Sequence, residues 1–105
     1  MGAVALGIGG ALLEEVRYDE QGQPLAGTFM DYAMPRSTDV PSLRIEHLET
    51  LSPLNPLGLK GVGESGTLPV SAVLASAIED ALAAEGAVIR QMPLTPPRLR
   101  GLLAR

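Results

Sequence analysis

Residues 60–86, KGVGESGTLPVSAVLASAIEDALAAEG, are the stretch of sequence that decides the fold. From Val70 onward, apolar residues recur with the i, i+3, i+4, i+7 spacing of an amphipathic helix. Thr67 is a good residue for the N-cap of such a helix, and Gly86 supplies a stop. The pattern therefore predicts a helix over about residues 67–85.

A glycine-rich loop precedes this helix. Gly61, Gly63 and Gly66 satisfy the literal pattern G-x-G-x-x-G. A dinucleotide-binding loop of that type follows a strand, but residues 51–59 are interrupted by prolines, which exclude a regular strand. A Walker loop needs a lysine after its last glycine, and none follows Gly66. The loop is thus not predicted to bind a nucleotide in either of these ways.

Glu64 is the only ionisable side chain between Lys60 and Glu79. The glycines around it let the backbone approach a ligand without side-chain clashes, and a helix N-terminus favours an anion. Two interpretations of this carboxylate stay open at this point. It is either a first-turn charge that stabilises the helix or a positioned base.

A second helix is predicted over residues 3–16, and it contains Gly7, Gly9 and Gly10. Each glycine in a helix interior costs about 1 kcal/mol relative to alanine. The cluster therefore implies close approach of another backbone or of a ligand. Apolar residues lie on several faces of this helix, which is typical of a helix buried inside something larger.

Between and after these helices, short strands and loops are expected. Residues 15–28 predict a β-hairpin around the turn at 19–24, and alternation over 43–48 predicts one more strand. The chain has 12 glycines and 9 prolines, which favour irregular loops. We therefore predict one unit, residues 1–105, of the α+β class, with two main helices, a small antiparallel sheet and Pro/Gly-rich loops.

Composition excludes several classes of function. With no cysteine, the chain has no disulfide, cysteine nucleophile, iron–sulfur ligand or thiolate zinc site. A net charge of −4 argues against nucleic-acid binding. The apolar run at residues 3–13 is too short for a membrane span and follows no basic residue, so we expect no membrane insertion, no export and a cytoplasmic location.

Three further groups of polar residues are candidates for a functional role. His47 has no second histidine nearby, so no metal site is predicted there. Asp31, Tyr32 and Arg36 could line a pocket, although structural hydrogen bonding is the simpler interpretation. Basic residues that follow the last acidic residue form a solvated or docked tail, or else face an anion; they are Arg90, Arg98, Arg100 and Arg105.

Five motifs stand in order along the chain: Gly7-Ile8-Gly9 with Ala11-Leu12-Leu13-Glu14-Glu15, Phe29-Met30-Asp31-Tyr32-Ala33-Met34-Pro35, His47-Leu48-Glu49-Thr50, Lys60-Gly61-Val62-Gly63-Glu64, and Pro93-Leu94-Thr95-Pro96. In this order they resemble the carboxyl-terminal end of a molybdenum hydroxylase large subunit. This is the family of xanthine dehydrogenase, aldehyde oxidase and aerobic carbon monoxide dehydrogenase. The resemblance implies the C-terminal part of a molybdopterin-binding domain, with residues 61–64 as the active-site loop.

The resemblance also implies an activity, which is oxidative hydroxylation of an aldehyde, a heterocycle or carbon monoxide with oxygen derived from water. Glu64 matches the family's glutamate base, and a carboxylate that is ionised near neutral pH can take that role. No residue is implied as a direct metal ligand. The residues implied to contact the cofactor are Lys60, Gly61, Val62, Gly63, Gly7 and Gly9.

The implied cofactor is molybdopterin carrying molybdenum, as the cytosine dinucleotide, with most contacts supplied by other polypeptide. The implied partners are the remainder of the large subunit, iron–sulfur and FAD-carrying subunits, and a small-molecule substrate. The alternative is a non-catalytic fragment or interaction module that docks on another subunit. Leu6, which stands where family members commonly have Gln, favours this alternative.

Overall fold

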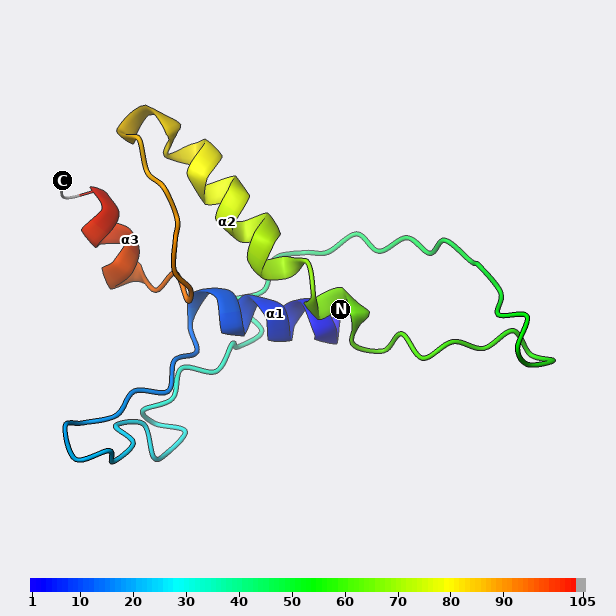
Figure 1. The fold of residues 1–105 in the computed structure, drawn as a ribbon, viewed down its shortest axis with the longest axis horizontal. Coiled ribbons are helices and arrows are strands. Elements are labelled where there is room, and N and C mark those ends of the chain that lie inside the picture. The colour runs from blue at the N-terminus through cyan, green and yellow to red at the C-terminus, as the bar shows by residue number, and fades with distance from the viewer. Residues whose placement is uncertain (104–105) are drawn as a thin grey trace.

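The computed structural model describes residues 1–103, and within them it contains three α-helices. They are α1 (Gly2–Leu12), α2 (Val70–Ala81) and α3 (Pro96–Leu103), with short 3-10 helices η1 (Ser65–Thr67) and η2 (Ala83–Glu85). Helix α1 lies at the centre, α2 crosses it, and α3 lies near the C-terminal end of the chain (Figure 1).

Helix α1 packs against α2 through a glycine. A Cβ atom placed on Gly7 would lie 2.6 Å from the Cβ of Val70, a distance that real side chains do not tolerate. On the same helix, Gly9 is covered by the Glu14 side chain and by Pro35. These two glycines thus permit other parts of the chain to approach the backbone of α1 closely. Gly10 differs, because nothing lies within 4 Å of its Cβ position.

The core around this contact is small. Its buried apolar residues are Ile8, Ala11, Val70 and Leu94. Leu94 belongs to the segment before α3, and its backbone N–H donates to the carbonyl of Ala11 at 2.6 Å. Helix α1 is therefore the element on which both later helical segments are anchored.

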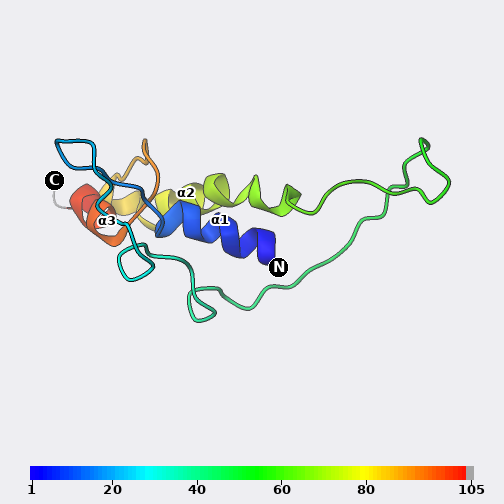
Figure 2. The same cartoon turned by 90° about the horizontal axis from the view of Figure 1, so that it is seen from below.

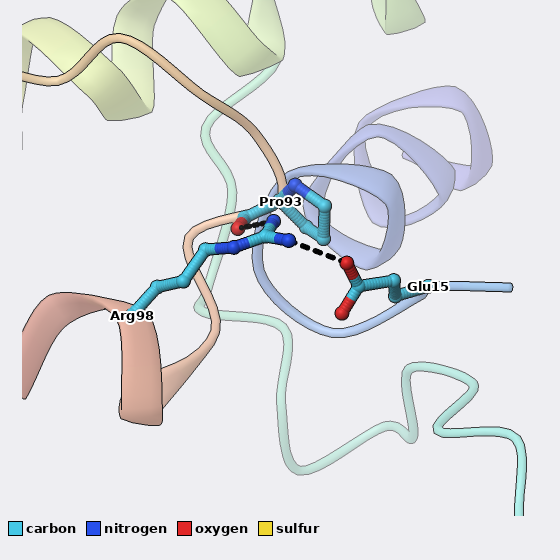
Figure 3. Close-up of polar contacts among 3 residues, drawn as sticks. All are labelled: Glu15, Pro93 and Arg98. Atoms are coloured by element: carbon cyan, nitrogen blue, oxygen red, sulfur yellow. Dashed lines mark hydrogen bonds and ion pairs between the residues drawn. The ribbon is translucent and has the colours of Figure 1, made fainter. Parts of the chain in front are cut away.

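Helix α3 is held against the N-terminal segment by one arginine (Figure 3). Nη1 of Arg98 donates to the carbonyl of Pro93 at 2.8 Å, and Nη2 pairs with Oε1 of Glu15 at 2.5 Å. Both charged side chains are only about 30% exposed. The tail is thus docked at Arg98, while Arg105 lies outside the described residues.

The predicted antiparallel sheet is wrong, since residues 1–103 contain no strand and three helices instead of two. The expected hairpin is reduced to a single bridge between Tyr18 and Pro24, with Asp19 closing the turn by accepting from the backbone of Gln21 and Gln23. Pro24 has no N–H to continue a ladder, and an isolated two-stranded hairpin is marginal in water.

The expected strand at 43–48 is also absent, because no neighbouring segment of the described chain pairs with it. Alternation of side chains marks a half-buried strand only where a partner strand and a core are present. The first helix ends at Leu12, earlier than expected. Helix α2 begins at Val70 instead of near Thr67, and the chain turns away at Gly86 in the left-handed conformation, with φ 66°.

The molecule is extended. Its radius of gyration is 17.7 Å, whereas a compact domain of this length has about 13 Å. Its accessible surface is 8495 Å², against about 5,600 Å² for a compact protein of this mass. Much of the excess comes from residues 41–64, which leave the helices as a long double arm, here called the strap (Figures 1 and 2).

Substituting two glycines of α1 tests the close contact between α1 and α2. Gly7→Ala is expected to lower the free energy of unfolding by about 1–3 kcal/mol, because the new methyl group overlaps Val70. Gly10→Ala is the matched control and is expected to raise it by about 0.5–1 kcal/mol, since it only improves helix propensity. Thermal unfolding measures both. Equal effects would contradict the packing of α2 on α1.

Removing the Arg98 side chain tests the docking of α3. Arg98→Met is expected to cost about 1–2 kcal/mol of unfolding free energy, because it removes a partly buried charge-assisted hydrogen bond. Arg44→Met breaks the exposed pair with Glu46 and is expected to cost less than about 0.5 kcal/mol. Denaturant unfolding compares the two. A cost at Arg98 no larger than at Arg44 would reject this anchoring role.

Candidate functional site

Glu64 lies at the end of the strap, immediately before η1. The turn that carries it is built by Ser65, whose backbone N–H and hydroxyl both donate to the carbonyl of Val62, at 3.2 and 2.6 Å. The carbonyl of Glu64 in turn accepts the N–H of Thr67 at 2.9 Å. The position of the carboxylate is therefore set by a short hydrogen-bonded turn within an otherwise open segment.

A shallow hollow that is wide open to solvent lies beside this turn, with a volume of about 480 Å³, and is lined by Gly61, Val62, Gly63, Glu64, Ser65 and Leu68. A Cβ atom on Gly61 or Gly63 would meet nothing within 4 Å, so the backbone there is bare. The Glu64 side chain is exposed, and within residues 1–103 no basic side chain forms an ion pair with it. The structure thus brings four predicted site residues to one hollow.

The other three predicted site residues lie elsewhere. Nζ of Lys60 donates to Oγ1 of Thr50 across the strap at 2.7 Å. Gly7 and Gly9 are buried in α1, against Val70 and Pro35. None of these three lines the hollow beside Glu64.

The strap upstream of the site has a defined tip. Asn55 binds both backbone groups of Leu59: its Oδ1 accepts the N–H at 2.9 Å and its Nδ2 donates to the carbonyl at 2.9 Å. Gly58 turns the chain with φ 66°. Leucines along the strap are largely exposed, with Leu48 at 97% and Leu54 at 91%. A surface of this kind in water is typical of a contact region.

A second polar contact joins two of the motifs. The hydroxyl of Tyr32 donates to Oε2 of Glu14 at 2.7 Å, beside a hollow of about 390 Å³. The hydrogen bond to the Glu14 carboxylate, partial burial and the carboxylate charge together raise the pKa of Tyr32. Asp31 instead accepts from Thr28, and Arg36 pairs with Asp39. These polar residues thus have structural partners, and Tyr32 and Arg36 also line the hollow, so both interpretations describe part of the arrangement.

Among the described residues, no group of three histidine, cysteine, aspartate or glutamate side chains could hold a metal ion, and His47 belongs to no such group. None of the helices in residues 1–103 is long and apolar enough to cross a membrane. Sequence reasoning missed the partners of Thr67 and Arg98, because Ala3 and Glu15 lie far away in the sequence and local patterns do not encode such contacts. It also missed the contacts of Asn55, although these are local, since Leu59 is only four residues away.

Comparison with known proteins places these features in a family. The model of the molybdopterin cofactor-binding domain family matches residues 1–41. The chain is 44% identical over 100 residues to the 6-hydroxypseudooxynicotine dehydrogenase complex subunit gamma of Paenarthrobacter nicotinovorans, covering 94% of the chain and 12% of that protein. It is 40% identical to the carbon monoxide dehydrogenase large chain of Afipia carboxidovorans, covering 87% and 10%. The chain belongs to the molybdenum hydroxylase large-subunit family.

A solved structure agrees. The quinoline 2-oxidoreductase of Pseudomonas putida 86 matches with a TM-score of 0.90 and 48% identity, over 97% of the chain and 13% of that protein. The chain therefore spans about an eighth of the length of these molybdenum hydroxylase relatives. The family match at residues 1–41 covers α1 and Tyr32, while the Glu64 loop lies outside it.

The Tyr32 contact can be tested by titration. Glu14→Gln is expected to lower the pKa of Tyr32 toward its ordinary value, because the amide carries no charge that opposes the tyrosinate. The difference in tyrosinate absorbance between the parent and a Tyr32→Phe variant isolates this group. Because the folded pKa is the higher one, the stability from this contact is present below the ordinary tyrosine pKa and is lost as pH rises through the folded value.

Asp31→Asn serves as the control, since Asp31 contacts Thr28 instead of Tyr32. An unchanged titration of Tyr32 in the Glu14→Gln variant would contradict the assigned hydrogen bond.

Proposed function

We propose that this chain supplies the general base of a molybdenum-dependent oxidative hydroxylation, and that Glu64 is that base. The observation that supports the proposal is the exposed Glu64 carboxylate at a hollow with bare glycine walls and no cation paired with it among the described residues. A carboxylate neutralised by a buried arginine would be a poor proton acceptor, and no arginine within residues 1–103 pairs with Glu64.

The residues around the hollow fit an anionic pterin cofactor in one respect. Gly61 and Gly63 leave the backbone accessible, so a large group could approach the chain without a side-chain clash. When bound, molybdopterin with molybdenum would supply the redox chemistry, and the protein supplies position and charge. We propose Gly61, Val62 and Gly63 as contacts of this cofactor in its cytosine dinucleotide form.

Lys60, Gly7 and Gly9 are part of the same proposal, although each already has a partner in this structure. Lys60 would have to release its hydrogen bond to Thr50 before its ammonium group could contact the cofactor. Gly7 and Gly9 have no side chains, so they could contact the cofactor only through backbone atoms. Val70 and Pro35 already lie close to their Cα atoms.

In the proposed reaction, Glu64 accepts a proton from the water-derived oxygen nucleophile as that oxygen attacks an electrophilic carbon. The two electrons that the carbon loses would pass to the molybdenum cofactor when it is bound, as a hydride from the C–H bond of an aldehyde or heterocycle and without a hydride from carbon monoxide. The substrate is an aldehyde, a heterocycle or carbon monoxide. General-base catalysis of this kind contributes typically about 10²–10⁴-fold to a rate. The hydrogen bonds of Ser65 and Thr67 hold the Glu64 backbone during this step, so little reorganisation is needed.

We further propose that the remainder of the large subunit covers the extended surface of this chain, and that iron–sulfur and flavin subunits receive the electrons in the cytoplasm. The accessible surface exceeds that of a compact protein by roughly 2,900 Å², which is more than the area of about 800 Å² that each partner buries in a standard interface. The exposed leucines of the strap fit such a covered contact. The alternative, a non-catalytic docking module, shares this surface but leaves Glu64 without a role.

The experiment that tests the function uses the enzyme assembled with the full large subunit. Glu64→Gln is expected to lower turnover by about 10²–10⁴-fold while molybdenum and pterin content stay unchanged, because only the proton acceptor is lost. Glu20→Gln, in the exposed turn, is the matched control and should keep parental turnover. Parental turnover in Glu64→Gln would reject the base and favour the docking module.

A further inference from the structure

The loop that carries Glu64 has few contacts of its own. Between Gly61 and Gly66 the backbone hydrogen bonds are local, and the Cβ positions of Gly61 and Gly63 have no neighbour within 4 Å. Glycine leaves a backbone more freedom than any other residue. The direction of the Glu64 carboxylate therefore depends on how the ends of this loop are fixed.

The downstream end is fixed on α1. Oγ1 of Thr67 donates to the carbonyl of Ala3 at 3.1 Å, in a partly buried contact between residues 64 positions apart. Beside it, a Cβ atom on Gly66 would lie 3.3 Å from the Cβ of Ala3, so η1 is packed closely on the first turn of α1. One hydroxyl and one glycine thus join the turn to the central helix.

This anchor is connected to Glu64 by a single turn. The N–H of Thr67 donates to the carbonyl of Glu64 at 2.9 Å, so two hydrogen bonds through Thr67 link Glu64 to Ala3. The upstream end is weaker, since the bond from Lys60 to Thr50 is exposed and lies within the strap itself. Only the Thr67 end ties the loop to the core.

The hydroxyl of Thr67 does not cap the helix that follows it, although this is the usual role of a threonine at such a position. The sequence predicts Thr67 as the N-cap of α2, yet the helix begins at Val70 and its N-cap residue, Pro69, makes no side-chain cap bond. The threonine hydroxyl is directed to α1 instead. It stabilises the position of η1 and contributes nothing to capping its own helix.

We infer that Thr67 is a positioning residue for Glu64: its hydrogen bond to the carbonyl of Ala3 holds the turn that presents the carboxylate at the hollow. The inference rests on the proposed function, because a positioning role requires that Glu64 act as the base. Loss of the bond leaves the carboxylate chemically intact but lets the glycine loop move. Small misplacements of a reacting group reduce rates strongly.

The test uses three variants in the assembled enzyme with its full large subunit. Thr67→Val keeps the shape and removes the hydroxyl, Thr67→Ser keeps the hydroxyl, and Thr38→Val is a matched control at an exposed loop position. Hydrogen exchange of the peptide containing Ser65 and residue 67 reports the anchor without any turnover. Steady-state kinetics over a range of pH and the cofactor content report its effect on the site.

Thr67→Val is expected to speed exchange of these amides by at least about fivefold and to lower kcat by about tenfold, with KM, cofactor content and the shape of the pH profile unchanged. Thr67→Ser is expected to restore both readouts to within about twofold of the parent, since its hydroxyl can donate to the same carbonyl. Thr38→Val should match the parent in both.

Three results would overturn the inference. One is parental exchange or parental kcat in Thr67→Val, and another is failure of Thr67→Ser to restore them. The third is a loss of kcat that matches a loss of bound cofactor, which would indicate a merely structural role. The Glu64→Gln variant distinguishes failure of the proposed function from failure of this inference. Parental turnover in that variant would show that Glu64 is not the base, whatever the hydrogen exchange of the Thr67 variants shows.

Discussion

The close contact between α1 and α2 at Gly7 is the constraint on which the rest of the structure depends. Val70 occupies the space that any side chain at position 7 would need, and both helices meet there over a core of only a few buried side chains. Helix α1 also receives the other segments: Thr67 binds its first turn, Leu94 its last turn, and Arg98 reaches Glu15 just beyond it. A central helix with small residues is suited to this, because neighbouring backbones can approach it directly. The cost of Gly7 and Gly9 in helix propensity is thus offset by tertiary contacts, whereas Gly10 has no such contact.

The same arrangement explains how the motifs of the molybdenum hydroxylase family come together. The first motif begins in α1 and ends just beyond it at Glu15. The second motif contacts the first through the hydrogen bond from Tyr32 to Glu14, and the last contacts α1 through Leu94. The Glu64 motif lies at the end of a long strap and returns to α1 only at η1. Residues that are distant in sequence are therefore organised around one short helix, with the proposed base at the boundary between the packed helices and the extended strap.

Local sequence predicted what local interactions determine. The apolar spacing from Val70 marks helix α2, although the helix ends at Ala81, earlier than the predicted residue 85. Gly86 adopts the left-handed conformation at the end of η2, which follows α2. The hairpin and the strand at 43–48 were wrong because pairing of strands is a property of two segments, and alternation in one segment does not create its partner. The turn at Asp19 did form, since its side chain needs only backbone groups two and four residues away. In the candidate site, the glycine loop around Glu64 was recognisable from the sequence, whereas the anchoring by Thr67 is a tertiary contact that no spacing rule supplies.

The exposure of Glu64 has a consequence for how the proposed reaction is divided between polypeptides. A general base is most effective where water is excluded, because fixed dipoles then replace a mobile hydration shell. This chain places the carboxylate and holds its backbone, but it leaves the side chain and the strap leucines in solvent. In the proposed reaction, exclusion of water would come from the polypeptide that we propose covers the strap, so that docking and assembly of the site would be one event. The contact that buries the strap leucines would then also enclose the Glu64 carboxylate, which follows these leucines in the sequence.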